Sequence, residues 1–257
     1  MNKLVSIITP SYNSAKYIAE TIQSVQNQTY TNWEMIIVDD CSTDDTEKII
    51  KEIQQIDFRI FFYKLDRNSG SGVARNFAVE KANGNYIAFL DSDDLWKPNK
   101  LLRQLTFMKN NNLPITFSFY EKINEKGSLL NKTVCSPKAI SYRMLFYCNW
   151  IGNLTGIYSV DFFGKISITS FRKRQDWALW LTLIKQVKNV IPVPESLAYY
   201  RVRKDSISAS KIKLIENNYL IYRNFHNNNW LFANLNTLLF LINQLFFKPI
   251  FTKNRKL

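Results

Sequence analysis

Short apolar runs alternate with amphipathic stretches along the first half of the chain, and this alternation limits the possible folds more than any other feature. Runs rich in β-branched and aromatic residues predict strands, and apolar residues at helical spacing predict helices. The expected strands are Leu4–Thr9, Trp33–Asp39, Ile60–Lys64, Tyr86–Leu90 and Ile115–Phe119. The expected helices are Ala15–Gln28, Thr43–Gln55, Gly72–Ala82 and Pro98–Lys109, the second capped by Ser42 or Thr43. The alternation predicts an α/β fold around a mostly parallel central sheet.

The second half is less regular. The pattern there predicts a helix at Gln175–Lys188, short strands near Val190–Pro192 and Leu197–Arg201, and a helix from Ala209 to Phe225. The sequence contains no internal repeat and no low-complexity linker. We therefore expect one domain over residues 1–208, followed by C-terminal helices over residues 209–257.

Composition excludes several kinds of site. The chain has 257 residues, of which 46% are hydrophobic and 21% charged, as in ordinary globular proteins. Its three cysteines form no CxxC pair, which argues against a disulfide framework or a zinc site and for a reducing, cytosolic compartment. The single histidine, His226, excludes multi-histidine metal sites and makes a His–Asp catalytic pair improbable. Carboxylates are expected to carry the chemistry, and oxygen ligands to hold any metal.

The net charge of +13 predicts an anionic partner such as a nucleotide, a nucleic acid or an acidic membrane surface. Much of this charge is C-terminal, where residues 201–257 contain ten Lys or Arg and two acidic residues. Residues 1–10 form a short β-rich run rather than a signal peptide, so no secretion is indicated.

The C-terminal segment Trp230–Phe251 is the most apolar part of the chain. Its asparagines interrupt the run before about 20 clean apolar residues are reached, which argues against a transmembrane helix. On a helical wheel one face carries Leu231, Leu235, Leu238, Ile242, Leu245 and Phe246. This face and the basic tail that follows predict a helix lying on a membrane surface. The alternatives are a helix that closes the core and a contact between two copies of the chain.

Acidic residues follow two of the expected strands. Asp39 and Asp40 come directly after the second strand, at the end where open α/β sheets bind ligands. Asp91, Asp93 and Asp94 follow the fourth strand, and their mutual repulsion favours a bound cation such as Mg²⁺ or Mn²⁺ together with a diphosphate. The alternative for this second group is a solvated acidic turn.

Residues 67–76 form a glycine-containing turn that enters a helix and carries Arg75, which could meet a phosphate or an acidic group. The turn lacks the third glycine of a dinucleotide fingerprint, and the chain has no P-loop. Later in the chain, Asp176 opens a helix whose Trp177 and Trp180 can face the core. In isolation, its commonest role would be that of a helix N-terminal acid.

Five ordered motifs together resemble the inverting family 2 glycosyltransferases of the GT-A fold. They are residues 5–13, 24–30, 38–44, 74–76 and 85–94. The resemblance is strong over about the first 100 residues and continues more weakly to about residue 210. It implies a GT-A domain with a C-terminal helical extension.

The resemblance also implies roles for individual residues. Pro10, Tyr12 and Asp39 would hold the nucleotide base, and Asp91 and Ser92 would lie near the ribose. Asp93, with Asp91, would bind Mn²⁺ or Mg²⁺, and Arg75 would neutralise phosphate or orient the acids. Asp176 is similar to the family's general base. Residues 199–208 resemble a lid in which Arg201, Arg203 and Lys204 would face the diphosphate. Many relatives have a metal-binding His at the position of Arg203, and an Arg cannot bind a metal.

Contacts with the acceptor are expected from the middle of the chain. Indole rings stack on sugars and amides bond hydroxyl groups, which makes Trp150 and Asn153 candidates. Asp94 is a third candidate for the acceptor site.

By analogy with similar short bacterial enzymes, the expected function is inverting transfer from a UDP-sugar to a lipid-linked saccharide in O-antigen or capsule synthesis. The expected location is the inner face of the cytoplasmic membrane. Alternatives are a nucleotidyltransferase, a non-catalytic nucleotide-sugar-binding member of the family, and a basic nucleic-acid-binding protein. No RRM, OB or helix-turn-helix signature supports the last, so we expect no nucleic-acid partner.

Overall fold

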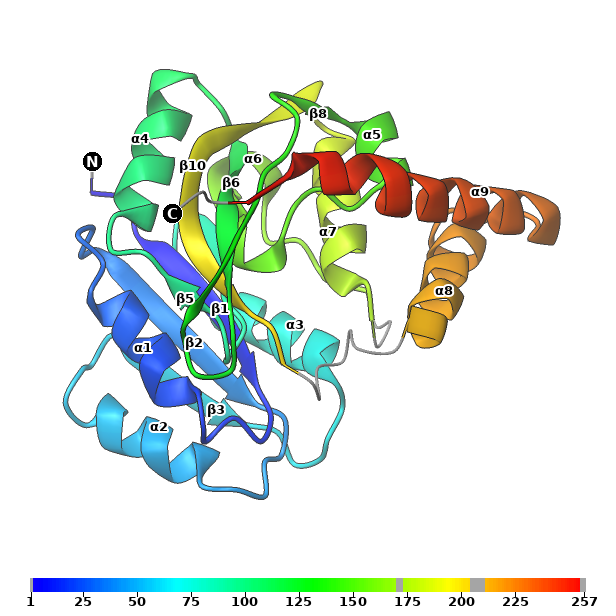
Figure 1. Cartoon of the computed structure of the whole chain (residues 1–257). Helices are drawn as coiled ribbons and strands as arrows, with labels where there is room; N and C mark the ends of the chain where they lie inside the picture. The colour runs from blue at the N-terminus through cyan, green and yellow to red at the C-terminus, as the bar shows by residue number, and fades with distance from the viewer. Residues whose placement is uncertain (1, 170–172, 204–210, 255–257) are drawn as a thin grey trace.

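A computed structural model describes residues 2–169, 173–203 and 211–254, without the side chains of residues 211–214. Strands and helices alternate through the first half, as predicted (Figure 1). The elements are β1 (Val5–Ser11), α1 (Ile18–Gln26), β2 (Trp33–Asp39), α2 (Thr46–Gln54), β3 (Ile60–Lys64), α3 (Ser71–Lys81), β4 (Tyr86–Phe89), β5 (Leu95–Trp96) and α4 (Lys100–Asn110). Strands β1 to β4 pair in parallel, in the order β4-β1-β2-β3.

The second half adds mainly antiparallel strands. Its elements are β6 (Ile115–Ile123), β7 (Leu129–Val134), β8 (Ile140–Ser141), α5 (Tyr142–Tyr147), η1 (Asn153–Thr155), β9 (Ile157–Ser159), α6 (Val160–Phe163), α7 (Gln175–Ile184), β10 (Asn189–Arg201), α8 (Lys211–Leu220), η2 (Ile221–Phe225), α9 (Trp230–Ile242), η3 (Asn243–Phe247), η4 (Lys248–Phe251) and β11 (Thr252–Asn254). The central sheet is therefore mixed rather than parallel throughout. The two short strands expected after residue 189 are one strand, β10, with register shifts.

The sheet separates two apolar cores because successive strand residues point to opposite faces. On β1, Ile8 faces the core formed with α3, α7 and α9, whereas Val5 and Ile7 face the core formed with α1 and α4. Trp177 and Trp180 of α7 are fully buried in the first core, as their helical spacing predicted. This packing fixes the start of α7, where Asp176 lies.

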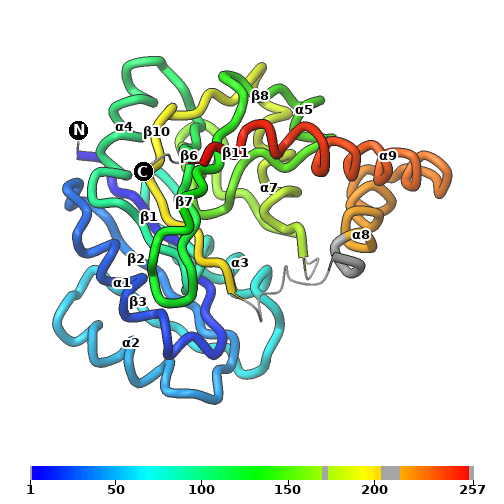
Figure 2. The backbone as a smooth tube through the Cα atoms, in the orientation of Figure 1, coloured from blue at the N-terminus to red at the C-terminus, as the bar shows by residue number. Residues whose placement is uncertain are grey.

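The C-terminal segment returns to the domain. Figure 2 shows the chain after α9 running back to the sheet, where β11 pairs antiparallel with β7. Phe240 of α9 is fully buried, with its ring centroid 4.7 Å from that of Trp177. Trp230–Phe251 is, by length and composition alone, apolar enough to cross a membrane, a test that core helices of soluble proteins also pass. One side of α9 thus forms part of the core of the domain, and its other side is exposed.

The predicted cap of the second helix is wrong. α2 begins at Thr46 with Asp45 at its N-cap position, rather than at Ser42 or Thr43. The Ser42 hydroxyl instead donates a hydrogen bond to the carboxylate of Asp39. The polar residues at 42–43 therefore form the turn after β2 and do not begin the helix.

Gly156 should be intolerant of a side chain because the core is closed around it. A Cβ atom there would lie 2.3 Å from a ring carbon of Trp180, which is itself fully buried. Overpacking of this kind costs about 1–3 kcal/mol, so we expect Gly156→Ala to lower the melting temperature by several degrees. Thermal unfolding followed by circular dichroism measures this, and an unchanged midpoint would contradict the packing described.

Candidate active site

Three parallel strands end at one edge of the sheet and bring polar residues together. Ser11 at the end of β1 is opposite Asp39 at the end of β2. β4 pairs with β1 on its other side, and Asp91 follows β4 by two positions. Carboxyl ends of parallel strands are the usual ligand-binding edge of such sheets. The candidate site is therefore built on this edge.

Asp39 is fully buried and is bonded within the chain. Its Oδ1 accepts from the hydroxyls of Ser11 (2.9 Å) and Ser42, and its Oδ2 accepts from the Ser42 N–H at 2.8 Å. A carboxylate has about four acceptor positions, but Asp39 has no exposed surface, so a contact of Oδ2 with a base would require the site to open. Asp39 thus holds the β1 and β2 ends together in addition to its predicted contact with a base.

Asp40, beside it, fixes the glycine-containing turn. Its two oxygens accept from the backbone N–H groups of Ser69 (2.6 Å) and Gly70 (2.7 Å). Gly70 has φ +92°, a conformation that residues with a side chain rarely adopt. Asp40 therefore positions the start of α3, the helix that carries Arg75.

Tyr12 and Ser92 lie at the same edge. The Tyr12 side chain is 48% exposed directly after β1, so an aromatic ring is open to a ligand there. Pro10 lies within β1, opposite Val38 of β2. Ser92 is hydrogen-bonded through its hydroxyl to that of Ser14 at 2.7 Å. The predicted base-binding and ribose-binding residues are thus grouped around the ends of β1 and β4.

The acids after β4 each have a different partner. Asp91 Oδ1 accepts from Arg75 Nη2 at 2.5 Å and from Asn153 Nδ2 at 3.0 Å. Asp93 Oδ2 accepts from Arg203 Nη1 at 2.8 Å. Burial, with the charge of Asp91 as the second cause, raises the pKa of Asp93 above its ordinary value. The acids are therefore close enough to repel one another, as the sequence predicted.

Asp94 lies inside the protein. It is 2% exposed, and its Oδ1 accepts from the backbone N–H of Arg201 at 2.8 Å. Burial, followed by the charges of Asp93 and Asp91, raises its pKa well above the ordinary value. Its predicted contact with an acceptor would require the site to open around it.

Two carboxylates suit a divalent cation that is shared with a diphosphate. Asp91 and Asp93 supply hard oxygen atoms, and their mutual repulsion would be relieved by a cation. Among the described residues, no group of three or more His, Cys, Asp or Glu is arranged to hold a metal. The donor set thus fits a metal whose remaining ligands come from phosphate and water, and it does not fit an all-protein site.

Arg201 has a structural position. Its side chain is fully buried, and its guanidinium donates to the carboxylate of Glu20 (2.6 Å) and to the carbonyls of Asp93 (2.8 Å) and Glu125 (3.0 Å). These bonds tie the end of β10 to the acidic turn. The predicted contact of Arg201 with a diphosphate would require these hydrogen bonds to break.

The guanidinium of Arg203 is 5.1 Å from the ring centroid of Tyr17 and is hydrogen-bonded to Asp93. Lys204 and the rest of the predicted lid lie outside the described residues.

Gln175 joins the acidic turn to α7. Its Oε1 accepts from Arg75 Nη1 at 2.8 Å, while Arg75 also holds Asp91. A Cβ on Gly72 would lie 2.8 Å from the Gln175 side chain, so the two helices touch at this point. Gln175 was not predicted as a site residue, although it is the immediate neighbour of Asp176.

Asp176 is half-buried at the start of α7. Its Oδ2 accepts from Asn149 Nδ2 at 3.1 Å. The chain Asp91–Arg75–Gln175 leads to it through hydrogen bonds and one peptide bond. Its charge also acts on Tyr120, whose pKa burial raises above the ordinary value. One carboxylate thus lies beside the acidic turn without belonging to it.

Comparison with known proteins identifies the family. The sequence model for glycosyl transferase family 2 matches residues 6–163. The chain belongs to this family. It is 43% identical over 220 residues to the putative teichuronic acid biosynthesis glycosyltransferase TuaG of Bacillus subtilis, covering 86% of this chain and 87% of TuaG. It is 37% identical over 226 residues to the Escherichia coli UDP-Glc:alpha-D-GlcNAc-diphosphoundecaprenol beta-1,3-glucosyltransferase WfgD, covering 88% and 87%.

Solved structures show the same fold. S. aureus TarS 1–349 in complex with UDP-GlcNAc superposes with a TM-score of 0.72 at 21% identity, covering 96% of this chain and 74% of that one. The mannosyltransferase PcManGT of Pyrobaculum calidifontis, in complex with GDP-Man and Mn²⁺, has a TM-score of 0.64 at 14% identity, covering 94% and 74%. This family 2 glycosyltransferase therefore has the expected GT-A fold.

The remaining predicted acceptor residues of this glycosyltransferase are mostly enclosed. Trp150 is 8% exposed, with its ring centroid 5.1 Å from that of Phe251 in the C-terminal segment. Asn153 is 9% exposed and uses its Nδ2 to hold Asp91. Asn153 thus belongs to the site through Asp91, whereas Trp150 packs against the C-terminal segment.

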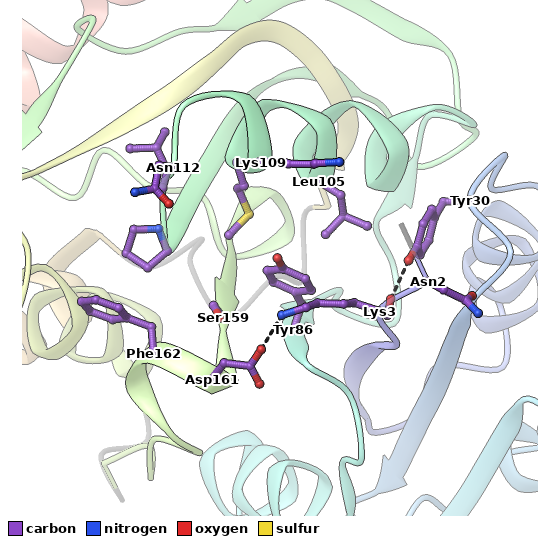
Figure 3. Close-up of a pocket in the computed structure, with 13 residues that line it drawn as sticks. Asn2, Lys3, Tyr30, Tyr86, Leu105, Lys109, Asn112, Ser159, Asp161 and Phe162 are labelled. Carbon is purple, nitrogen blue, oxygen red and sulfur yellow. Dashed lines mark hydrogen bonds and ion pairs between the residues drawn. The ribbon is translucent and has the colours of Figure 1, made fainter.

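A pocket of about 750 Å³ lies at the opposite edge of the sheet (Figure 3). Lys3, which precedes β1, and Tyr86, which begins β4, line it together with Asp161. Lys3 Nζ pairs with Asp161 Oδ2 at 2.5 Å. The pocket is at the amino ends of the strands and does not belong to the candidate active site.

Proposed function

We propose that this glycosyltransferase moves a sugar from a UDP-sugar to a lipid-linked saccharide, with inversion at the transferred carbon. The observation that carries the proposal is the separation of roles among the carboxylates. Asp91 and Asp93 lie on one turn with arginine partners, whereas Asp176 lies on α7 and is linked to that turn through Gln175 and Arg75. Inversion by direct displacement requires this kind of separate base.

In the proposed mechanism Asp176 accepts the proton of the attacking acceptor hydroxyl. Asn149 Nδ2 orients the carboxylate through Oδ2, which leaves Oδ1 for the hydroxyl. Arg75 lies between Gln175 and Asp91, where its charge can stabilise the negative charge that develops on the leaving diphosphate. The exposed ring of Tyr12 would stack on the base, and Ser92 would lie near the ribose.

The proposed metal is Mn²⁺ or Mg²⁺, held by Asp93 with Asp91. When bound, such an ion stabilises negative charge on a leaving diphosphate without proton transfer. Arg203 pairs with Asp93 in this structure and would remain beside the metal-binding carboxylate as a second positive charge. Support comes from the two neighbouring carboxylates, since burial and, after it, the charge of Asp91 raise the pKa of Asp93.

We place the enzyme on the inner face of the cytoplasmic membrane, in synthesis of a cell-surface polysaccharide such as O-antigen or capsule. The names of TuaG and WfgD support the pathway and the lipid-linked acceptor. The apolar face of α9 and η3 supports the membrane contact, because its side chains point away from the core. They are Leu231 (57% exposed), Leu235 (48%), Leu238 (55%), Ile242 (38%), Leu245 (66%) and Phe246 (68%).

The packing of Trp230–Phe251 against the domain favours a helix that lies along the membrane surface over one that spans the membrane. Phe240 and Thr237 of α9 pack against the domain, and β11 returns to the sheet after the helix. A spanning helix would have to break both contacts. Phe240, which is not on the apolar face that the helical wheel predicts, packs against Trp177 in the core.

Substitution of this apolar face should release the protein from membranes. Each side chain gains about 1 kcal/mol when its exposed half enters the lipid, so we expect the triple variant Leu235→Gln, Leu238→Gln, Phe246→Gln to bind about 10²-fold more weakly. Sedimentation with vesicles containing phosphatidylglycerol measures this. The control replaces Leu129 and Leu130 of β7, which are 45% and 39% exposed, by Gln. Equal binding of the triple variant and the wild type would refute the membrane contact.

Product analysis tests the proposed reaction. The enzyme is incubated with UDP-glucose or UDP-N-acetylglucosamine and diphosphoundecaprenol-linked N-acetylglucosamine, and the products are identified by mass spectrometry and NMR. We expect UDP as the released nucleotide and a β-linked product from an α-linked donor. Release of pyrophosphate would instead indicate a nucleotidyltransferase, and a retained α configuration would exclude direct displacement.

A further inference from the structure

Three basic side chains close to one another near Asp176 have no carboxylate partner in ion-pair contact among the described residues. Lys122 lies on β6, Arg174 precedes α7, and Lys248 begins η4 in the C-terminal segment. Ion pairs within the described ranges involve none of the three. All three side chains are partly buried, and a cation that loses part of its water without gaining a counter-charge is destabilised. This basic cluster therefore suits an anion from outside the protein.

Lys248 and Asp176 are both hydrogen-bonded to Asn149. Lys248 Nζ donates to the carbonyl oxygen of Asn149 at 2.6 Å, and Asn149 Nδ2 donates to Asp176 Oδ2 at 3.1 Å. The charges of Arg174 and Lys122 also reach Lys248. Burial is the main cause that lowers the pKa of Lys248, and both cations lower it further, whereas Asp176 opposes them. The basic cluster thus lies directly beside the proposed base.

Two polar atoms at this place lack a hydrogen-bond partner. Asn149 is 8% exposed, and its Oδ1 is buried and unbonded in the part of the chain that the structure describes. The Nε of Arg174 is likewise buried and has no hydrogen-bond partner among the described residues. Arg174 is held there with φ +65°, a conformation uncommon for residues other than glycine. The Nε of Arg174 can donate to a phosphate oxygen, whereas Asn149 Oδ1 can accept only from a donor such as a hydroxyl of the acceptor sugar, so a sugar attached to a diphosphate would complete the hydrogen bonding of both atoms.

We propose that the basic cluster Lys122, Arg174 and Lys248 binds the diphosphate of the lipid-linked acceptor. This inference rests on the proposed function, because it assumes an acceptor sugar attached through a diphosphate to a lipid. With the acceptor hydroxyl at Asp176, its diphosphate lies within one sugar ring of that carboxylate, on the side of Lys248. A diphosphate diester has one negative charge on each phosphate, which suits three cations beside one carboxylate.

The direction of the chain supports the lipid as the source of this diphosphate. Lys248 follows directly on η3, whose Leu245, Phe246 and Phe247 are 66%, 68% and 52% exposed. A lipid tail that leaves the basic cluster would enter the membrane along this apolar face. The diphosphate of the donor has a separate candidate partner in Arg75, which is hydrogen-bonded both to Gln175 and to Asp91 of the acidic turn.

Vesicle binding tests the inference without knowledge of the acceptor sugar. Phosphatidylcholine vesicles contain either undecaprenyl diphosphate or, at equal charge, phosphatidylglycerol. We expect the wild type to prefer the diphosphate vesicles by about 10-fold or more, as charge-assisted hydrogen bonds predict. Lys248→Met and Lys122→Met should each remove most of this preference, and Lys248→Arg should retain it. The matched control is Lys48→Met, an exposed lysine on α2 outside the C-terminal segment.

Calorimetric titration with UDP separates the possible failures. If the wild type binds UDP and Lys248→Met binds it equally well, the cluster does not serve the donor, as we propose. A weaker UDP affinity in Lys248→Met would assign the cluster to the donor and overturn the inference. A preference for diphosphate vesicles that persists in both Lys248→Met and Lys122→Met would also overturn it. Absence of UDP binding in the wild type would instead refute the proposed function.

Discussion

Asp176→Asn is expected to slow sugar transfer by about 10³-fold, the usual scale for loss of a general base. Asn has nearly the shape of Asp but cannot accept the proton of the acceptor hydroxyl at neutral pH. Its amide oxygen can still accept the hydrogen bond from Asn149, so the start of α7 should be unchanged. The measurement is the rate of UDP release from a UDP-sugar in the presence of acceptor.

The control for this variant is nucleotide binding. Asp176 is one residue beyond Gln175 and has no hydrogen bond to Asp91 or Asp93, so the affinity for UDP should stay within about twofold of the wild type. A transfer rate within about tenfold of the wild type would exclude Asp176 as the base. Equal losses in UDP affinity and rate would show that the substitution disturbs the donor site.

Asp93→Ala is expected to reduce transfer by about 10²-fold or more and to remove the response to Mn²⁺. Asp93 is the proposed metal ligand, and stabilisation of a leaving diphosphate by a metal contributes several kcal/mol. The substitution also frees the Arg203 guanidinium, which is bonded to Asp93 in this structure. Rates of transfer are measured over a series of Mn²⁺ concentrations.

A matched acid controls for charge at the same edge of the sheet. Asp66 follows β3 by two residues and is exposed, and Asp66→Ala removes one carboxylate outside the acidic turn. We expect its transfer rate and Mn²⁺ dependence to match those of the wild type. If Asp93→Ala responds to Mn²⁺ as the wild type does, Asp93 is not the metal ligand.

The sequence predicted the first half of the fold closely because local patterns determine it. β2 and β3 have the predicted bounds, and the four helices between residues 15 and 110 occur as expected, with each end within three residues of its predicted position. β11 could not be predicted, since Thr252–Asn254 is a short polar run without periodicity. Its pairing with β7 depends on a contact between residues about 120 positions apart. Phe240 shows the same limit, because only its packing against Trp177 explains its position in α9.

The acids of the candidate site could be predicted from their place after strands, whereas their partners could not. Asp91 and Asp93 follow β4, which the pattern showed. Gln175 and Asn149 have no such signal, since their contacts with Arg75 and Asp176 join distant parts of the chain. The burial of Arg201 also depends on Glu20, which is 181 positions away. The sequence around Arg201 gives no sign that its side chain is already paired with Glu20.

The most direct test of the central claim is calorimetric titration of the wild-type protein with UDP and with GDP, each with and without Mn²⁺. The claim is that the carboxyl edge of β1, β2 and β4 binds a uridine diphosphate group together with a divalent metal. We expect UDP to bind only weakly without Mn²⁺ and at least about tenfold more tightly with it, and GDP not to bind measurably. Failure of both nucleotides to bind, with or without Mn²⁺, would contradict the account.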